Sequence, residues 1–197
     1  MPCSRRPEAG AARFVRLAAA AWLALAVWTG HAFGAGIALR EFRFAPGEET
    51  YDLSVNADFE LPAALENLLE KGVTLTFRAE VEVQRPRWWW LNEGVSRRGQ
   101  NIRLSYQALT RQYRVSTGAL QSSYTSLPEA LRKITRIRNW PVVERRELKA
   151  GAQYEAVFRF YHDVSQLPKP LQVTAFASSD WDLSAPPKTW TFVPEAR

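Results

Sequence analysis

The chain has 197 residues, of which 46% are hydrophobic and 12% aromatic, and its formal net charge is +6. This length suits one well-packed domain and is too short for two large ones. With one cysteine and two histidines, the chain can form neither a disulfide framework nor a zinc site built from several thiolates.

The N-terminal segment has the three parts of a secretory signal peptide. Four arginines precede an apolar run from Leu17 to Trp28, and small residues follow between Gly30 and Ala35. The run is shorter than the roughly 20 residues of a membrane-spanning helix. We therefore expect residues 1–34 to be a cleaved signal peptide, with an uncleaved membrane anchor as the alternative, and residues 35–197 to form a single β-rich domain in the periplasm.

Removal of this segment leaves few side chains for catalysis. It takes away Cys3 and His31, lowers the formal net charge from +6 to +3 by removing four arginines and one glutamate, and leaves His162 as the one histidine of residues 35–197. His162 follows an alternating stretch and precedes Asp163, which favours a strand-end histidine with a turn-forming aspartate over a catalytic base. No nucleophile elbow or phosphate loop occurs in the sequence.

We therefore expect no catalytic residue, no metal site and no cofactor. A metal-free hydrolase that uses His162 or paired carboxylates is the least favoured alternative. We expect this chain to be an exported protein that acts by binding.

The first half of the domain has clear periodic patterns. Apolar and polar residues alternate from Tyr51 to Leu61, which predicts a half-buried strand. Pro62 and Gly72 suit the start and the stop of a helix, so a helix of about ten residues is expected between them. Strict alternation from residue 73 to residue 84 predicts the clearest strand of the chain, with one face in water.

Shorter elements follow residues 85–90 and a polar turn. Strands are predicted around residues 102–108, 113–115 and 120–124, and again at 154–160, 171–177 and 189–193. Ser126 and Glu129 have the spacing of a capping box, and apolar residues at helical intervals predict a second helix from Leu127 until Trp140 and Pro141. Seven or eight short strands with two short helices predict a mainly β fold, either an antiparallel β-sandwich or a curled α+β sheet.

Charge is unevenly distributed along the domain. Residues 33–84 have a net charge of −6, whereas residues 85–146 have a net charge of +10. One interpretation is a basic face that attracts anionic lipid, an envelope polymer or an acidic protein domain. The other is that acidic and basic strands pair within one sheet. Four of the cations in residues 85–146 are expected mostly on the polar side of the second helix: Arg132, Lys133, Arg136 and Arg138. Nucleic acid is not an expected partner of an exported protein.

A cluster of arginine and tryptophan occurs at residues 85–90. Strand alternation would send Trp88 and Trp90 to one face and Trp89 to the other, so an indole outside the core is one outcome, with a neighbouring guanidinium stacked on it. Packing of the cluster in the core is the other outcome, and the pattern leaves both open. The candidate interaction surface consists of Arg85, Arg87, Trp88, Trp89, Trp90, Arg132 and Arg136.

Several strings of the sequence carry a family resemblance. They are residues 85–90, residues 104–115 (LSYQALTRQYRV), Asn139-Trp140-Pro141, and residues 165–173 followed by Ser179-Asp180-Trp181. In these strings, and over nearly all of the chain after residue 34, the protein resembles the domain of unknown function 4390 family of proteobacteria. The resemblance implies a signal peptide and brings no catalytic residues with it.

Genes of that family often neighbour genes of nitrogen-regulation-type sensor kinases. The resemblance therefore implies an extracytoplasmic accessory of a membrane sensor, with an envelope protein such as the kinase's extracytoplasmic region as partner. Together with the residues above, it predicts an exported, non-catalytic interaction or accessory module. Binding of anionic lipid or envelope polymer through a basic face is the alternative.

Overall fold

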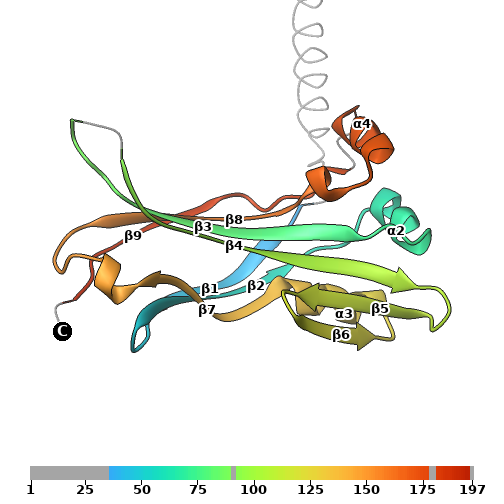
Figure 1. Cartoon of the computed structure of the whole chain (residues 1–197), viewed down its shortest axis with the longest axis horizontal. Helices are drawn as coiled ribbons and strands as arrows, with labels where there is room; N and C mark the ends of the chain where they lie inside the picture. The colour runs from blue at the N-terminus through green and yellow to red at the C-terminus, as the bar shows by residue number, and fades with distance from the viewer. Residues whose placement is uncertain (1–35, 90–91, 178–180, 196–197) are drawn as a thin grey trace, which may run out of the picture. The chain divides into compact units, whose positions relative to one another are not determined.

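The structure is a computed structural model and describes residues 36–89, 92–177 and 181–195. The predicted signal peptide, residues 1–34, lies outside these residues. The elements described below belong to the unit Ala35–Arg197. They form two antiparallel sheets, one of six strands and one of three, with short helices at their ends (Figure 1). The predicted mainly β, antiparallel fold class is confirmed.

Strand order in the two sheets differs from the order in the chain. The six-stranded sheet has the order β6 (Leu120–Tyr124), β5 (Gln112–Thr117), β4 (Glu93–Gln107), β3 (Leu75–Arg85), β8 (Tyr154–His162) and β9 (Lys188–Phe192). The three-stranded sheet has the order β1 (Ala38–Pro46), β2 (Thr50–Asp58) and β7 (Arg136–Glu144). The helical segments are α2 (Ala63–Glu70), α3 (Leu127–Thr135), α4 (Lys169–Ala177) and the short 3-10 turns η1 (Arg145–Glu147) and η2 (Val164–Gln166).

Strand β3 lies at the centre of the larger sheet, between β4 and β8. Its alternation was the strongest pattern in the sequence, and its apolar residues are fully buried on the inner face: Leu75, Phe77, Ala79, Val81 and Val83. The polar residues between them face the other side of the sheet, where they meet residues of β4 and β8 in register. The predicted strand with one polar face is therefore confirmed.

Aromatic side chains join the two sheets. Phe42 of β1 packs against Phe158 and Trp190 of the larger sheet, with ring centroids 6.2 Å and 4.7 Å away. Phe44 of β1 lies 4.8 Å from Phe192 and 5.2 Å from Trp190. Aromatic pairs in these geometries contribute beyond the area that they bury. The three-stranded sheet is thus held against the inner face of β8 and β9.

The sequence analysis did not predict β1, and the reason is a bulge. The register of β1 against β2 shifts between Leu39 and Glu41, so the alternation that marks a strand is interrupted at Arg40. Only Phe42 and Phe44 remain in step, and two residues are too short a pattern to identify a strand. The strand is stabilised by its pairing with β2 and by the aromatic contacts described above.

The first half of β4 was predicted as a polar turn and is a strand instead. Its inward-facing residues are polar because they meet the free edge of β7 and not an apolar core. Ser96 Oγ donates a hydrogen bond of 2.7 Å to the Val142 carbonyl, and Arg98 lies 3.9 Å from the Glu144 carboxylate. These contacts give a backbone carbonyl and a carboxylate of β7 their partners where the two sheets touch. Because the contacting residues of β4 are polar, this half of the strand lacks the apolar alternation by which a strand is recognised.

Helix α2 agrees with the prediction at both ends. Pro62 is its N-cap, and Gly72 has φ +85°, a left-handed conformation that glycine adopts without strain. The N–H of Gly72 donates to the Leu69 carbonyl and the N–H of Val73 donates to the Leu68 carbonyl, which is the Schellman pattern of a helix end.

Helix α3 starts where predicted but ends at Thr135, before the predicted stop at Trp140 and Pro141. Ile137 fits a helical and an extended pattern equally well, and pairing with β2 draws residues 136–144 into β7. The predicted capping box is wrong: Ser126 is the N-cap but makes no side-chain cap bond.

Residues 171–177 were predicted as a strand and belong to helix α4, so the described residues contain three α-helices where two were expected. Pro170 stands in the first turn, where a proline ring fits a helix. Leu171 is half-buried and Ala175 buried, whereas Val173 between them is 73% exposed. Burial four residues apart is the spacing of a helix face, so the apparent period of two was misleading.

No helix in the described residues is long and apolar enough to cross a membrane.

The aromatic junction between the sheets predicts a large cost for truncating one of its members. Phe158 is 1% exposed, so Phe158→Ala removes buried ring area and leaves a cavity; we expect the free energy of unfolding to fall by about 3–5 kcal/mol. Leu109→Ala changes a fully exposed turn residue and should alter it by less than about 0.5 kcal/mol. Urea unfolding of both variants measures the difference, and equal losses would contradict the assigned core.

Candidate interaction surfaces

The connection between β3 and β4 presents two tryptophans to solvent. Trp88 is 89% exposed and Trp89 is 65% exposed, and both lie in a turn rather than in a strand. Their rings meet edge to face with centroids 4.8 Å apart. Core packing, which the sequence left open, is therefore wrong for Trp88 and Trp89, while Trp90 lies outside the described residues. In Figure 1 this connection projects away from both sheets.

Two arginines at the neck of this hairpin share one carboxylate. Arg85 and Glu93 are the last register pair of β3 and β4, and the Arg85 guanidinium donates to Glu93 Oε2. The Arg87 guanidinium donates to the same oxygen at 2.7 Å. Hydrogen bonds from Arg87 and then from Arg85 lower the pKa of Glu93, so the carboxylate stays charged near neutral pH. The arginines expected to stack on the indoles are thus bound to Glu93.

Arg132 and Arg136, the other members of the predicted surface, lie elsewhere. Arg132 stands in the last turn of α3, and Arg136 is the first residue of β7. Figure 1 shows α3 and the start of β7 far from the β3–β4 connection. The prediction that Arg136 and Arg138 share the polar side of a helix with Arg132 is wrong, because the chain is already extended at these positions. The structure divides the predicted surface into two separate places.

Part of the charge asymmetry is explained by pairing between strands. Glu82 of β3 is the register partner of Arg97 in β4 and lies 3.5 Å from Arg159 of β8. Arg98 of β4 approaches Glu144 of β7. The Arg98 contact joins the two sheets within the basic segment, whereas the expected pairing of an acidic with a basic strand in one sheet is present between β3 and β4. It does not extend to the cations of α3 and early β7: within the described residues, Arg132, Lys133, Arg136 and Arg138 have no ion pair.

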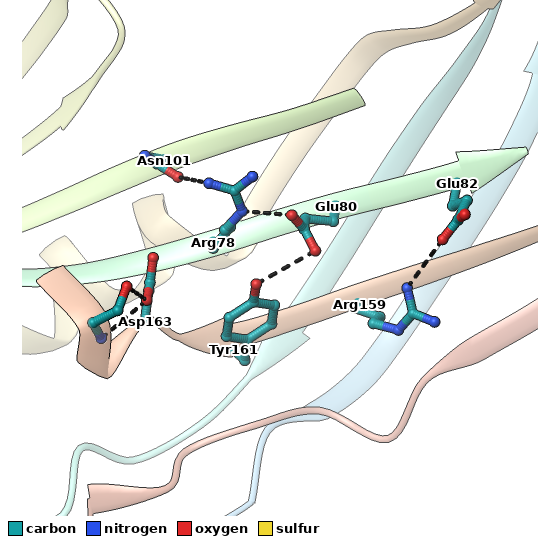
Figure 2. Close-up of polar contacts among 8 residues, drawn as sticks. Arg78, Glu80, Glu82, Asn101, Arg159, Tyr161 and Asp163 are labelled. Atoms are coloured by element: carbon teal, nitrogen blue, oxygen red, sulfur yellow. Dashed lines mark hydrogen bonds and ion pairs between the residues drawn. The ribbon is translucent and has the colours of Figure 1, made fainter. Parts of the chain in front are cut away.

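A small polar network lies on the outer face of the larger sheet, on its central strands (Figure 2). Glu80 is 9% exposed, and its two carboxylate oxygens accept from Arg78 Nε at 2.6 Å and from the Tyr161 hydroxyl at 3.4 Å. Arg78 also donates to Asn101 Oδ1 at 3.3 Å. The four residues come from β3, β8 and β4, so the network ties three strands together. Sequence analysis missed it, although the charged outward positions of β3 were its visible signal.

The chemistry of this network is that of a structural contact. Burial, and next the charge of Glu80, raise the pKa of Tyr161, so its phenol stays protonated and acts as a donor. The hydrogen bond to Glu80 raises the pKa of Arg78, which stays charged. Neither group is adjusted toward the proton transfer near neutral pH that general acid–base catalysis requires.

His162 ends β8 inside the protein. It is 4% exposed, and its Nδ1–H donates to the Trp181 carbonyl at 3.3 Å, while Nε2 has no hydrogen-bond partner in the described residues. Burial lowers the pKa of the imidazole, so it is neutral at neutral pH. Asp163 follows as the cap of η2 and accepts from the Ser165 N–H. The strand-end histidine with a turn-forming aspartate is confirmed.

Among the surface hollows of the described residues, five of the best formed are lined neither by His162 nor by the Arg78–Glu80 network. Arg132 lines the hollow between α3 and the end of β2. Arg136 and Arg138 line a groove of about 420 Å³ between β7 and the β5–β6 hairpin. Across residues 36–89, 92–177 and 181–195, no three His, Cys, Asp or Glu side chains form a group that could hold a metal ion.

The chain matches a model of a protein family over most of its length. The family model described as "Domain of unknown function (DUF4390)" matches residues 34–191. No curated protein and no solved structure matches the chain.

The buried Glu80 network predicts unequal effects for two glutamates of the same strand. Glu80→Ala leaves Arg78 and Tyr161 without their acceptor, and we expect it to lower the free energy of unfolding by about 1–3 kcal/mol. Glu82→Ala removes an exposed pair with Arg159 and should cost less than about 1 kcal/mol. Urea unfolding compares the two, and a larger loss for Glu82→Ala would overturn the role given to Glu80.

His162 predicts a pH dependence of stability. Because its pKa is lowered in the folded state, the unfolded chain, in which histidine titrates near 6.5, binds more protons as the pH falls through that value. The free energy of unfolding should therefore be fully retained above pH 6.5 and decline below it, by at most about 1.4 kcal/mol per pH unit. His162→Gln should lose this decline. Urea unfolding between pH 7.5 and 5.5 tests it, and parallel curves for the two proteins would contradict it.

Proposed function

We propose an interaction function for this chain, which belongs to the domain of unknown function 4390 family (DUF4390). In this proposal it is an exported, periplasmic and non-catalytic accessory module that docks onto an envelope protein through the tip of the β3–β4 hairpin. The observation that carries the proposal is the exposure of Trp88 and Trp89 in the connection between these strands.

Burial of the two exposed indoles against a partner would contribute strongly to the free energy of binding. A tryptophan side chain buries roughly 150–250 Å² on full burial, and each Å² of apolar area contributes about 25 cal/mol. Docking of the pair therefore provides several kcal/mol before ordering costs are subtracted. Tryptophan and arginine are also the residues that most often dominate protein interfaces. Because neither ring contributes to the core, recognition is the role that best accounts for their position.

The hairpin is organised in advance for such a contact. Arg85 and Arg87 both bond to Glu93 across its neck, and the two rings rest against each other edge to face. A surface that is already ordered pays less conformational entropy on binding. The connection projects from the sheets (Figure 1), so it fits a concave site on a partner better than it fits a small ligand.

The extracytoplasmic region of a membrane sensor kinase is the partner that we propose. It follows from the gene neighbourhood implied by the family and from the expected export of this chain. Indoles flanked by arginines are also typical of the membrane–water interface, so insertion of the hairpin into lipid is the competing outcome of the test below.

The experiment compares the wild type with the double variant Trp88→Ala/Trp89→Ala. Binding to the purified extracytoplasmic region of a sensor kinase encoded beside a gene of this family is measured by surface plasmon resonance. We expect the double variant to bind at least about 100-fold more weakly, the equivalent of about 2.8 kcal/mol. Leu109→Ala/Val173→Ala is the matched control, because both are exposed apolar residues in other parts of the domain. This control should bind like the wild type.

Flotation with vesicles containing anionic phosphatidylglycerol separates protein docking from lipid insertion. The hairpin would be assigned to the membrane by three results together: the wild type floats with the vesicles, the tryptophan double variant does not, and the wild type does not bind the kinase region. Equal binding of all three proteins to the kinase region would contradict hairpin docking. Thermal unfolding of each variant confirms that an exposed substitution left the fold intact.

A further inference from the structure

We propose that a second surface, the groove between the β5–β6 hairpin and the first half of β7, binds an extended acidic peptide segment of another protein. This basic groove has a volume of about 420 Å³ and is lined by residues of β4, β5 and β6 on one side and of α3 and β7 on the other. It shares no residue with the tryptophan hairpin. The proposal therefore stands independently of the hairpin's role.

The groove itself contains no acid to balance its cations; Arg136 and Arg138 also border a neighbouring hollow that Glu41 lines. Lys133, Arg136 and Arg138 line the groove, and none of its lining residues is acidic. Within the described residues none of these three cations has an ion pair, whereas Arg85, Arg98 and other arginines do. Three like charges around one hollow repel one another, and an anionic occupant would relieve that repulsion. Charge complementarity therefore points to an acidic ligand.

A bulge in β7 shapes one wall of the groove. Leu53 of β2 is opposite Trp140 and Val55 is opposite Ile137, so two residues of β7 face Ser54 alone. One of them, Asn139, has φ +45°, a conformation that asparagine tolerates better than most residues. Ser54 holds it by accepting from the Asn139 N–H at 3.1 Å. The bulge turns the strand locally, and the four successive residues 136–139 all line the groove.

The opposite wall is formed by side chains of β4, β5 and β6, at the β6 end of the larger sheet. β6 is the last strand in the order of that sheet and pairs with β5 alone, so its outer backbone N–H and C=O groups have no strand partner within the described residues. β7 likewise pairs with β2 alone, and its other edge is occupied at Val142 by the Ser96 hydroxyl. An extended peptide binds such edges by adding main-chain hydrogen bonds.

The floor of the groove is apolar. Ile102, Val115 and Ile137 line it and are themselves buried, and Trp140 beside them is half-buried. A peptide in extended conformation sends alternate side chains to opposite sides, so apolar residues would contact this floor while acidic residues between them meet the cations. A phosphate polymer or a lipid headgroup would use the cations but neither the floor nor the strand edges. The combination therefore favours a peptide over either alternative.

The test uses fluorescence anisotropy with a labelled octapeptide in which glutamate and valine alternate. A second peptide of the same composition has the four glutamates first and the four valines last. We expect the alternating peptide to bind, its affinity to fall as salt is raised from 50 to 300 mM, and the block peptide to bind at least about tenfold more weakly.

A charge-reversal variant locates the site. Lys133→Glu/Arg136→Glu should weaken binding of the alternating peptide at least about tenfold. Arg103→Glu/Arg97→Glu makes the same change of charge on β4, outside the lining of the groove, and should weaken binding less than about threefold. The second variant controls for the net charge of the whole protein. Thermal midpoints are measured for both, and Arg136→Gln serves as a milder substitute if the first variant does not fold.

Several outcomes would overturn the proposal. They are the absence of peptide binding at 1 mM, equal binding of the two peptides, and equal losses in the two charge-reversal variants. Polyphosphate or phosphatidylglycerol vesicles that bind through Lys133 and Arg136, with no peptide binding, would assign the groove to an anionic polymer or to lipid. The tryptophan variant is not part of the peptide assay, so its binding to the kinase region does not affect the peptide result. The two proposed surfaces can therefore be refuted separately.

Discussion

The contact between aromatic side chains of the two sheets is the constraint on which the remaining structure depends. Phe42 and Phe44 of β1 pack on the rings of β8 and β9, and Tyr51 of β2 stacks 5.3 Å from Phe44. The domain has no cysteine within its described residues, so no disulfide ties the sheets there. Apolar burial and ring packing hold the smaller sheet in place, and they do so over the half of the larger sheet that contains β8 and β9.

Because the smaller sheet has only three strands, it leaves the other half of the larger sheet partly uncovered. β7 crosses over β4, where Ser96 and Arg98 meet its edge, and beyond it the β5–β6 hairpin has α3 as its neighbour. The basic groove is the space between these parts. The same arrangement explains why the inner face of β4 is polar in its first half and apolar at Ile102 and Leu104.

Two kinds of arginine can be distinguished by what they contact. Several on the larger sheet and at the hairpin neck, among them Arg78, Arg85 and Arg159, are bound to carboxylates of neighbouring positions. Those of α3 and early β7 have no such partner in the described part of the chain. The net charge of a sequence segment does not distinguish the two kinds of arginine. Exposed ion pairs contribute little to stability. Arginines without an ion pair remain available to bind an anionic partner.

The sequence by itself determined the structure of those parts of the protein in which a single local pattern of apolar and polar residues, or of helix start and stop residues, dominates. They include β3 with its strict alternation, α2 between Pro62 and Gly72, the strand-end position of His162 and the mainly β fold class. Only the tertiary structure decided that α3 ends at Thr135, that residues 169–177 are helical, and that Trp88 and Trp89 are exposed. The physical reason is that periodicity reports which side of an element is buried, whereas bulges, strand edges and turns obtain their hydrogen bonds and contacts from residues distant in the chain.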